Sequence, residues 1–327
     1  MTPSTALWLL TTLSTIPTPA NIKASVDRSL PLLLKAAEGH IGKQTCFACH
    51  NQALPMLAFH AARDRGLAVK DGDIKEQTDF VYAFLKTNKA KFLKGEGTGG
   101  QVDTAGYAML TLELGGQKPD DVTAAVASYL LKYQPNNDYW RTVSNRPPSE
   151  ASNFTTTYLA LRGLRVWGTQ DQKDAIAKRV QAAHNWLLKT LPKDTEDRVF
   201  RLLAMKEAGV ENNVIQVAAK SLRDLQRDDG GWSQLDGGPS DPYATGSALV
   251  ALNRVGGFNA KDPDYLRGLS FLLRTQKADG SWMIKSRSKP FQPYYESGFP
   301  HGKDQFISVS ASGWATAALV QGIKSPP

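Results

Sequence analysis

Two stretches of sequence decide the fold of this chain: QRDDGGW at residues 226–232 and QKADGSW at residues 276–282. Both place a glutamine six residues before a tryptophan, and Gln134 and Trp140 repeat that spacing. A similar apolar phrase precedes each copy: YLLKYQ at 129–134, SLRDLQ at 221–226 and FLLRTQ at 271–276. The chain is therefore built from a repeated unit.

Each unit reads as two helices. Apolar residues recur at spacings of three and four, the second helix opens with small hydroxyl residues, and a glycine often ends it, which are helix signals. We expect second helices at 103–115, 155–168, 245–256 and 312–322. Helix pairs are expected to begin near residues 25, 73, 119, 172, 212 and 263, and this period of roughly 45 residues is typical of helical repeats. The sequence predicts an all-α fold, a single α/α toroid of about six helix pairs within residues 21–327.

The glutamine-to-tryptophan phrases resemble the QW motifs of squalene-hopene cyclases and their relatives. The resemblance covers nearly the whole chain after residue 25. It implies that each glutamine caps a neighbouring outer helix and that each tryptophan stacks beside it. These residues therefore indicate architecture rather than chemistry.

The resemblance also implies an acid that this chain lacks. Class II cyclases protonate an alkene with an aspartate in a D-x-D-D-T-A pattern, and the nearest phrase here is GQVDTA at residues 100–105. It places Val102 where the proton donor belongs, and a valine cannot donate a proton. Those cyclases also enclose their substrate between two toroids. We therefore interpret Asp103 as a helix N-cap and predict that the chain is not a class II cyclase.

The two cysteines of the chain stand in the phrase CFACH at residues 46–50. In a C-x-x-C-H pattern the two thiols bind the vinyl groups of one haem, and the histidine then binds the iron. The sequence thus predicts covalent haem c on Cys46 and Cys49, with His50 as the proximal ligand. A redox-active dithiol and half of a zinc site remain as alternatives.

Connections within pairs are long, and they must all emerge on one rim of the toroid, because the two helices of a pair run antiparallel. The haem motif lies in such a connection, as does the loop at residues 277–308. Loops of that length usually carry function. We expect His301 to be the distal iron ligand, Tyr295 to assist it, and Arg141 and Arg287 to pair with haem propionates. Alternative sixth ligands are His40, His60, His184, Met56 and Met109.

The predicted function is that of an exported mono-haem protein in redox chemistry, either electron transfer or haem-dependent oxidation of an apolar substrate. Its expected partners are a redox protein and an apolar small molecule in the toroid. The alternatives are a terpenoid cyclase-like enzyme and a non-catalytic module that binds an apolar ligand. A squalene cyclase fold accommodates all three.

Residues 1–20 resemble a secretory signal, with an apolar run from Ala6 to Leu13 and small residues near Ala20, which predicts a periplasmic or secreted protein. No later segment reaches the ~20 apolar residues of a membrane span. The net charge of +8 comes from scattered lysines and arginines. It indicates a solvated basic surface rather than a nucleic-acid site.

Overall fold

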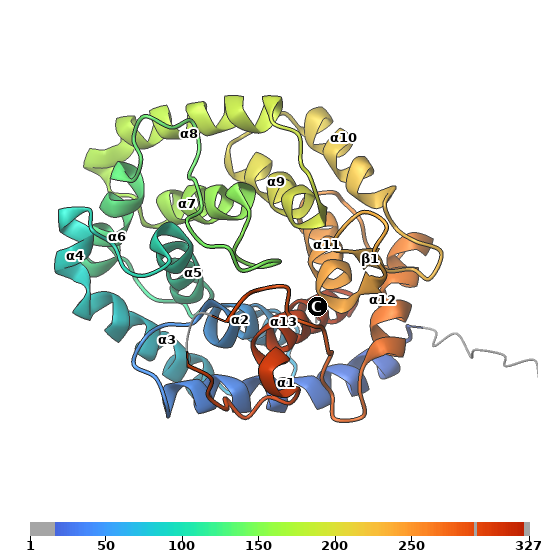
Figure 1. Cartoon of the computed structure of the whole chain (residues 1–327). Helices are drawn as coiled ribbons and strands as arrows, with labels where there is room; N and C mark the ends of the chain where they lie inside the picture. Colours follow the sequence, from blue (N-terminus) through green and yellow to red (C-terminus); the bar gives the residue numbers. More distant parts are fainter. Residues whose placement is uncertain (1–16, 291–292, 324–327) are drawn as a thin grey trace, which may run out of the picture.

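The computed structural model describes residues 17–290 and 293–323. These residues form six helix pairs arranged as two concentric rings (Figure 1). The outer ring consists of α1 (Pro19–Ile41), α3 (Asp71–Thr87), α4 (Lys89–Lys94), α6 (Asp121–Lys132), α8 (Lys173–Lys189), α10 (Asn212–Arg223) and α12 (Pro263–Thr275). The inner ring consists of α2 (Leu54–Arg63), α5 (Gln101–Leu114), α7 (Asn153–Trp167), α9 (Thr195–Glu207), α11 (Pro242–Arg254) and α13 (Gln305–Gln321).

The predicted all-α toroid is confirmed. The first helices of the six pairs begin at residues 19, 71, 121, 173, 212 and 263, close to the expected starts. The inner helix α13 begins at Gln305, well before the expected Ser312. The remaining elements are short: a π-helical turn η1 (Cys49–Ala53), two 3-10 turns η2 (Gln170–Gln172) and η3 (Gly302–Asp304), and a hairpin of β1 (Trp232–Ser233) with β2 (Ser240–Asp241). The predicted signal segment lies mostly outside the described residues.

The three tryptophans of the repeated phrase each join one outer helix to the inner helix that follows it. Trp140, Trp232 and Trp282 are completely buried, and the indole Nε1 of each donates to a main-chain carbonyl ten residues earlier, at 2.7, 2.8 and 2.8 Å. Their backbone N–H groups donate to the hydroxyls of Thr157, Thr245 and Ser312 on the inner helices. A buried indole needs a hydrogen-bond partner, so the phrase fixes the seam between the two rings.

The glutamines connect neighbouring pairs, as the resemblance implies. The amide of Gln226 donates to the carbonyl of Asp264 at the start of α12, at 2.7 Å. The amide of Gln276 donates to the carbonyl of Ser25 in α1, at 2.9 Å, and so joins the last pair to the first. Gln134 departs from the pattern, because Arg179 of α8 instead reaches back and donates to its carbonyl. Two of the three glutamines therefore join one helix pair to the next, and the contact of Gln276 closes the ring.

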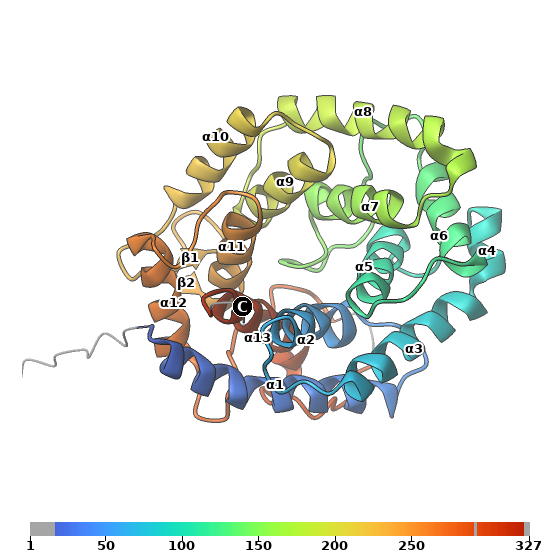
Figure 2. The same ribbon diagram turned by 180° about the vertical axis from the view of Figure 1, so that it is seen from behind.

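The connections within pairs gather on the face turned toward the viewer in Figure 1, and Figure 2 shows the opposite face with the links between pairs. The inner helices all begin on the first face, which we call the inner-start rim. Residues 134–153, 277–290 and 293–304 cross this rim between an outer and an inner helix. The rim is therefore the place where polar side chains from distant repeats meet.

Candidate functional site

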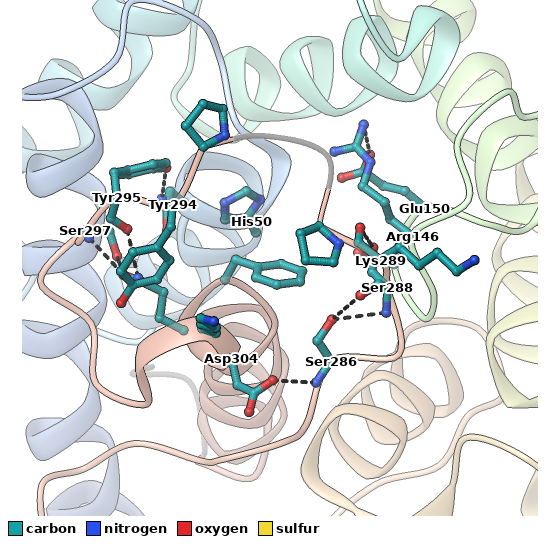
Figure 3. A pocket seen from close by; sticks show the side chains of 17 residues that line it. His50, Arg146, Glu150, Ser286, Ser288, Lys289, Tyr294, Tyr295, Ser297 and Asp304 are labelled. Carbon is teal, nitrogen blue, oxygen red and sulfur yellow. Dashed lines mark hydrogen bonds and ion pairs between the residues drawn. The ribbon is translucent and has the colours of Figure 1, made fainter.

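A cavity of ≈ 510 Å³ lies on the inner-start rim, and we call it the rim cavity. Three parts of the chain form its walls: the turn at His50 and Asn51, the segment 146–150, and residues within 286–290 and 293–306. Figure 3 shows His50 between two groups of side chains, with Tyr294 and Tyr295 on one side and Arg146 and Glu150 on the other. The volume lies within the range of small-molecule sites, which is roughly 300–1,000 Å³.

The π-helical turn η1 places His50 and Asn51 at the cavity. The side chain of Gln52 accepts a hydrogen bond from the backbone N–H of Ala48 at 2.9 Å and thereby caps the turn. Pro55, in the first turn of α2, has no backbone N–H and therefore cannot donate a hydrogen bond to a carbonyl of η1. Such widened turns are rare and are frequent at functional sites. The His50 ring meets the ring of Phe306 edge to face at 5.6 Å, and burial lowers the pKa of His50 to about 3, so this imidazole is neutral.

Glu150 is a buried carboxyl group on the cavity wall, with only 3% of its surface exposed. Arg146 and Glu150 pair through both backbone hydrogen bonds of a β-bridge, at 2.9 and 3.1 Å, and this bridge presents both side chains to the cavity. Ser152 then caps α7 by accepting from the N–H of Phe154, so the bridge is anchored to the inner ring. The Arg146 guanidinium lies 3.0 Å from Glu150 Oε2, near enough for an ion pair although it is poorly aligned for a hydrogen bond.

The pKa of Glu150 is raised to about 7, and burial is the main cause. The positive charge of Arg146 opposes the shift, the nearby carboxylate of Asp103 adds to it, and a hydrogen bond with the Cys49 thiol lowers it. A carboxyl group with this pKa is protonated in about half of the molecules at neutral pH. Glu150 is therefore able to give up a proton under conditions where an ordinary glutamate has none.

The opposite wall of the cavity is a loop held by polar contacts. The side-chain oxygen of Gln305 accepts hydrogen bonds from the backbone and the hydroxyl of Ser297, at 2.8 and 2.7 Å, and its amide donates to the carbonyl of Tyr295. The carboxylate of Asp304 accepts from the backbone of Ser286 at 2.8 Å. Two residues at the start of α13 thus fix the loop that carries Tyr295.

This loop also rests on α1 through Gly39, which gives a first prediction. A Cβ atom at Gly39 would lie 1.9 Å from the carbonyl oxygen of Ser297. We expect Gly39→Ala to push the loop away and to lower the free energy of unfolding by about 1–3 kcal/mol through overpacking. Chemical denaturation followed by circular dichroism measures the change.

Gly42→Ala is the matched control. Its Cβ atom would meet only backbone oxygens of α1, the nearest at 3.6 Å, and Gly42 already has a right-handed helical conformation. We expect its stability to stay within about 0.5 kcal/mol of the original chain or to rise slightly. Equal stability of the two variants would show that the loop does not rest on Gly39.

Two further buried acids lie near the starts of inner helices. Asp103 in α5 accepts hydrogen bonds from Thr156 and from Thr142, the latter at 2.7 Å, whereas Gly100 is the N-cap residue. The predicted N-cap role of Asp103 is therefore wrong, because its carboxylate ties α5 to α7 instead. Glu196 in α9 accepts from Thr155 at 3.1 Å and Tyr243 at 3.3 Å, and burial raises its pKa well above its usual value. Neither residue is among those that line the rim cavity.

The residues predicted as a site are only partly brought together. His50 and Tyr295 both line the rim cavity. Cys49 is buried against Glu150, while Cys46 is exposed. The predicted distal ligand and the predicted propionate partners are not among the residues that line the cavity: His301 Nε2 lies 2.8 Å from Ser281 Oγ, Arg287 donates to Gln234, and Arg141 is exposed. Sequence reasoning missed Glu150, whose only signal was its place in the long connection 134–153.

The fold matches solved structures of a type II terpene cyclase. The apo form of the cyclase MstE from Scytonema matches with a TM-score of 0.56 and 14% identity, over 92% of this chain and 97% of that one. A variant of MstE in complex with merosterolic acid A, its product, gives a TM-score of 0.57 at 13% identity. Another variant in complex with geranylgeranyl dihydroxybenzoate, its substrate, gives 0.57 at 12% identity and covers 93% of this chain.

Two curated proteins are similar in sequence. Drimenyl diphosphate synthase of Streptantibioticus cattleyicolor is 29% identical over 204 residues, which are 58% of this chain and 37% of that protein. Squalene–hopene cyclase of Bradyrhizobium diazoefficiens is 30% identical over 136 residues, 36% of this chain and 19% of that protein. The chain thus spans well under half the length of either relative. No protein-family model matches it.

These relatives overturn the prediction of a haem redox protein. The similar proteins are terpene cyclases, and two of the solved structures hold the substrate or the product of that cyclase. The predicted haem c on Cys46 and Cys49 is corrected accordingly, and the predicted iron-ligand roles of His50 and His301 lose their basis with it. None of these similar proteins supports the predicted redox partner.

The cyclase alternative fits better than the redox function predicted first, and it also goes against the prediction, drawn from Val102, that the chain is not a class II cyclase. Within residues 17–290 and 293–323, no cluster of three or more histidine, cysteine or acidic side chains is placed to bind a metal ion. None of the helices in the described part of the chain has the length and apolarity that a membrane crossing requires. In architecture and in its repeated glutamine-to-tryptophan phrases, the chain has the toroid fold of the squalene-hopene cyclase-like type II terpene cyclases.

Proposed function

We propose that this chain is a terpene cyclase-like enzyme that binds an isoprenoid at the rim cavity and starts its cyclisation with a proton from Glu150. The relatives support the reaction class, since they are a drimenyl diphosphate synthase and a squalene–hopene cyclase. The observation that carries the proposal is a protonatable carboxyl group, buried and facing a cavity of ≈ 510 Å³. A general acid must hold its proton at the working pH and must reach the substrate.

Glu150 takes over the role that Val102 cannot fill. Val102 is buried in the first turn of α5, at the position where the resemblance places the proton donor. Asp103, the next residue, lies close enough to Glu150 for its charge to raise the pKa of Glu150. The acid is therefore supplied by the connection before α7, on the same rim, rather than by α5 itself.

The surroundings of Glu150 stabilise its protonated form before the proton transfer and its carboxylate afterwards. Before the step, burial keeps the carboxyl group protonated. During the step, the proton leaves Glu150 for a carbon–carbon double bond, and the Arg146 guanidinium at 3.0 Å stabilises the carboxylate that remains. The cation formed on the isoprenoid faces the aromatic ring of Phe306, which stabilises positive charge through its π-electrons.

The mouth of the cavity suits an anionic head group. Lys289 and Lys303 are exposed residues of its lining, and Arg146 lies on the wall. The two exposed lysines at the opening attract a diphosphate and orient the hydrocarbon tail. The proposed substrates are therefore linear prenyl diphosphates rather than neutral hydrocarbons.

Incubation of the purified protein with farnesyl diphosphate, geranylgeranyl diphosphate and squalene tests the proposal. We expect a cyclic isomer from a prenyl diphosphate, detected by gas chromatography with mass spectrometry after phosphatase treatment, and none from squalene. Tight binding without any conversion would instead identify a module that only binds apolar ligands. A cyclic product from squalene alone would contradict the head-group assignment.

The pH dependence of turnover gives a second prediction. Because Glu150 must be protonated to react and its pKa is about 7, kcat/KM is expected to fall as the pH rises through neutrality. Initial rates measured from about pH 5 to about pH 9 should show a single deprotonation on the alkaline side. A profile that stays level through neutrality would show that a different group supplies the proton.

A further inference from the structure

A histidine and a tyrosine form a hydrogen-bonded pair behind the wall of the rim cavity. His40, in the last turn of α1, is buried with 2% exposure, and its Nδ1 lies 2.6 Å from the hydroxyl of Tyr295. Tyr295 itself lines the cavity. The two residues are 255 positions apart, so the fold of the whole ring creates the contact. The steps described above make no use of it.

The positions of the protons in this pair follow from its neighbours. His40 Nε2 lies 2.7 Å from the carbonyl oxygen of Cys46, and a carbonyl only accepts, so Nε2 carries the hydrogen. Burial lowers the pKa of His40 and keeps the ring neutral, which leaves Nδ1 without a hydrogen. The Tyr295 hydroxyl therefore donates to Nδ1.

Asn51 completes the arrangement. Its amide donates to the Tyr295 hydroxyl at 3.1 Å, and its own Oδ1 has no hydrogen-bond partner among the described residues although the side chain is buried. Tyr295 thus donates one hydrogen bond, accepts another, and keeps an oxygen lone pair for a third partner. The Tyr295 hydroxyl is the reactive group, His40 takes up its proton, and the carbonyl of Cys46 fixes the tautomer of His40. Together they form an activated acid–base unit.

We propose that Tyr295, backed by His40, is the base that ends the cyclisation. This role rests on the proposed function. A C–H bond beside the cationic carbon breaks, its electron pair forms the new double bond, and its proton goes to the Tyr295 oxygen. The proton already on that oxygen moves to His40 Nδ1. The result is a neutral alkene, a neutral tyrosine and an imidazolium, so atoms and charge balance.

The placement of the pair separates the two proton transfers. Figure 3 shows Tyr295 on one side of His50 and Glu150 on the other. A base next to the acid would return the first cation to substrate, whereas a base across the cavity acts after the hydrocarbon has folded. Tyr295 touches the substrate in this scheme, and His40 is a positioning residue that acts through it.

Variants of the pair test the proposal through the products formed. In Tyr295→Phe and in His40→Gln we expect substrate consumption to continue, because Glu150 is intact, while the products shift from alkenes to alcohols as water captures the cation. Glutamine retains hydrogen-bonding capacity but does not take up a proton, so a merely structural role of His40 would survive His40→Gln. Tyr82→Phe is the matched control, since Tyr82 bonds Asp120 outside the cavity.

A second measurement does not depend on turnover. Nitrogen-15 NMR of the histidine-labelled protein should show His40 as the Nε2–H tautomer, with an Nδ1 resonance that moves in Tyr295→Phe. A His40 protonated on Nδ1 at neutral pH, or an unchanged alkene-to-alcohol ratio in both variants, would overturn the base assignment and leave the role of Glu150 intact. Absence of any conversion by the unmodified protein would overturn the proposed function and the base assignment together.

Discussion

Replacement of Glu150 by glutamine is expected to lower the rate of isoprenoid cyclisation on the order of 10²- to 10⁴-fold, the usual contribution of a general acid. Glutamine keeps the shape of the side chain but has no acidic proton. The site should still bind substrate, because Arg146 and the rest of the lining remain. Single-turnover rates and equilibrium binding of the same prenyl diphosphate separate the two effects.

Glu207→Gln is the matched control for that experiment. Glu207 ends α9 away from the inner-start rim, and its carboxylate pairs with Arg165 at 2.5 Å. The same chemical change there should leave the rate of cyclisation unaltered. If Glu150→Gln and Glu207→Gln cyclise the substrate equally fast, Glu150 is not the acid.

Replacement of Trp282 by alanine is expected to lower the free energy of unfolding by about 3–5 kcal/mol, the usual cost of deleting a fully buried large aromatic side chain. Trp282 is completely buried, and its Nε1 donates to the carbonyl of Leu272 at 2.8 Å. The variant loses this packing and the indole hydrogen bond, while the carbonyl of Leu272 still accepts from the backbone N–H of Gln276 at 3.2 Å. Urea denaturation followed by tryptophan fluorescence and circular dichroism gives the difference.

The neighbouring residue supplies the control. Met283 is 39% exposed, so Met283→Ala removes a side chain of moderate size from the same segment without opening a deep cavity. Its effect should stay within about 0.5 kcal/mol, as for most surface positions. A comparable loss in both variants would mean that the segment, rather than the buried indole, determines stability.

The fold was predictable because its signals are local and repeated. The spacing between Gln226 and Trp232 recurs because the same seam between an outer and an inner helix recurs, with the same indole hydrogen bond at each of the three copies. Boundaries were less predictable. Thr245 and Ser312 suggested helix starts, yet their hydroxyls lie within the inner helices and accept hydrogen bonds from the backbone N–H groups of Trp232 and Trp282.

The site was predicted poorly because it is assembled from distant parts of the chain. Glu150 has no local pattern, and its pKa follows from burial and from neighbours such as Arg146 and Asp103, which only the folded ring brings together. The phrase at residues 46–50 led to the wrong prediction of a haem because its pattern is entirely local. A short pattern states which residues are adjacent in sequence, whereas the function of His50 depends on the cavity that it faces.

The hydrogen bond from Gln276 to Ser25 has a consequence for how this protein is made. It spans 251 residues, so α1 has no partner on one flank until the last helix pair has been synthesised. Earlier pairs pack on their predecessors as they leave the ribosome, because each contacts mainly its neighbours. The final step must then bring the two ends of an open arc together, and loop closure over such a separation is slow. Nascent chains that still lack the last helix pair are expected to be good substrates for chaperones and proteases.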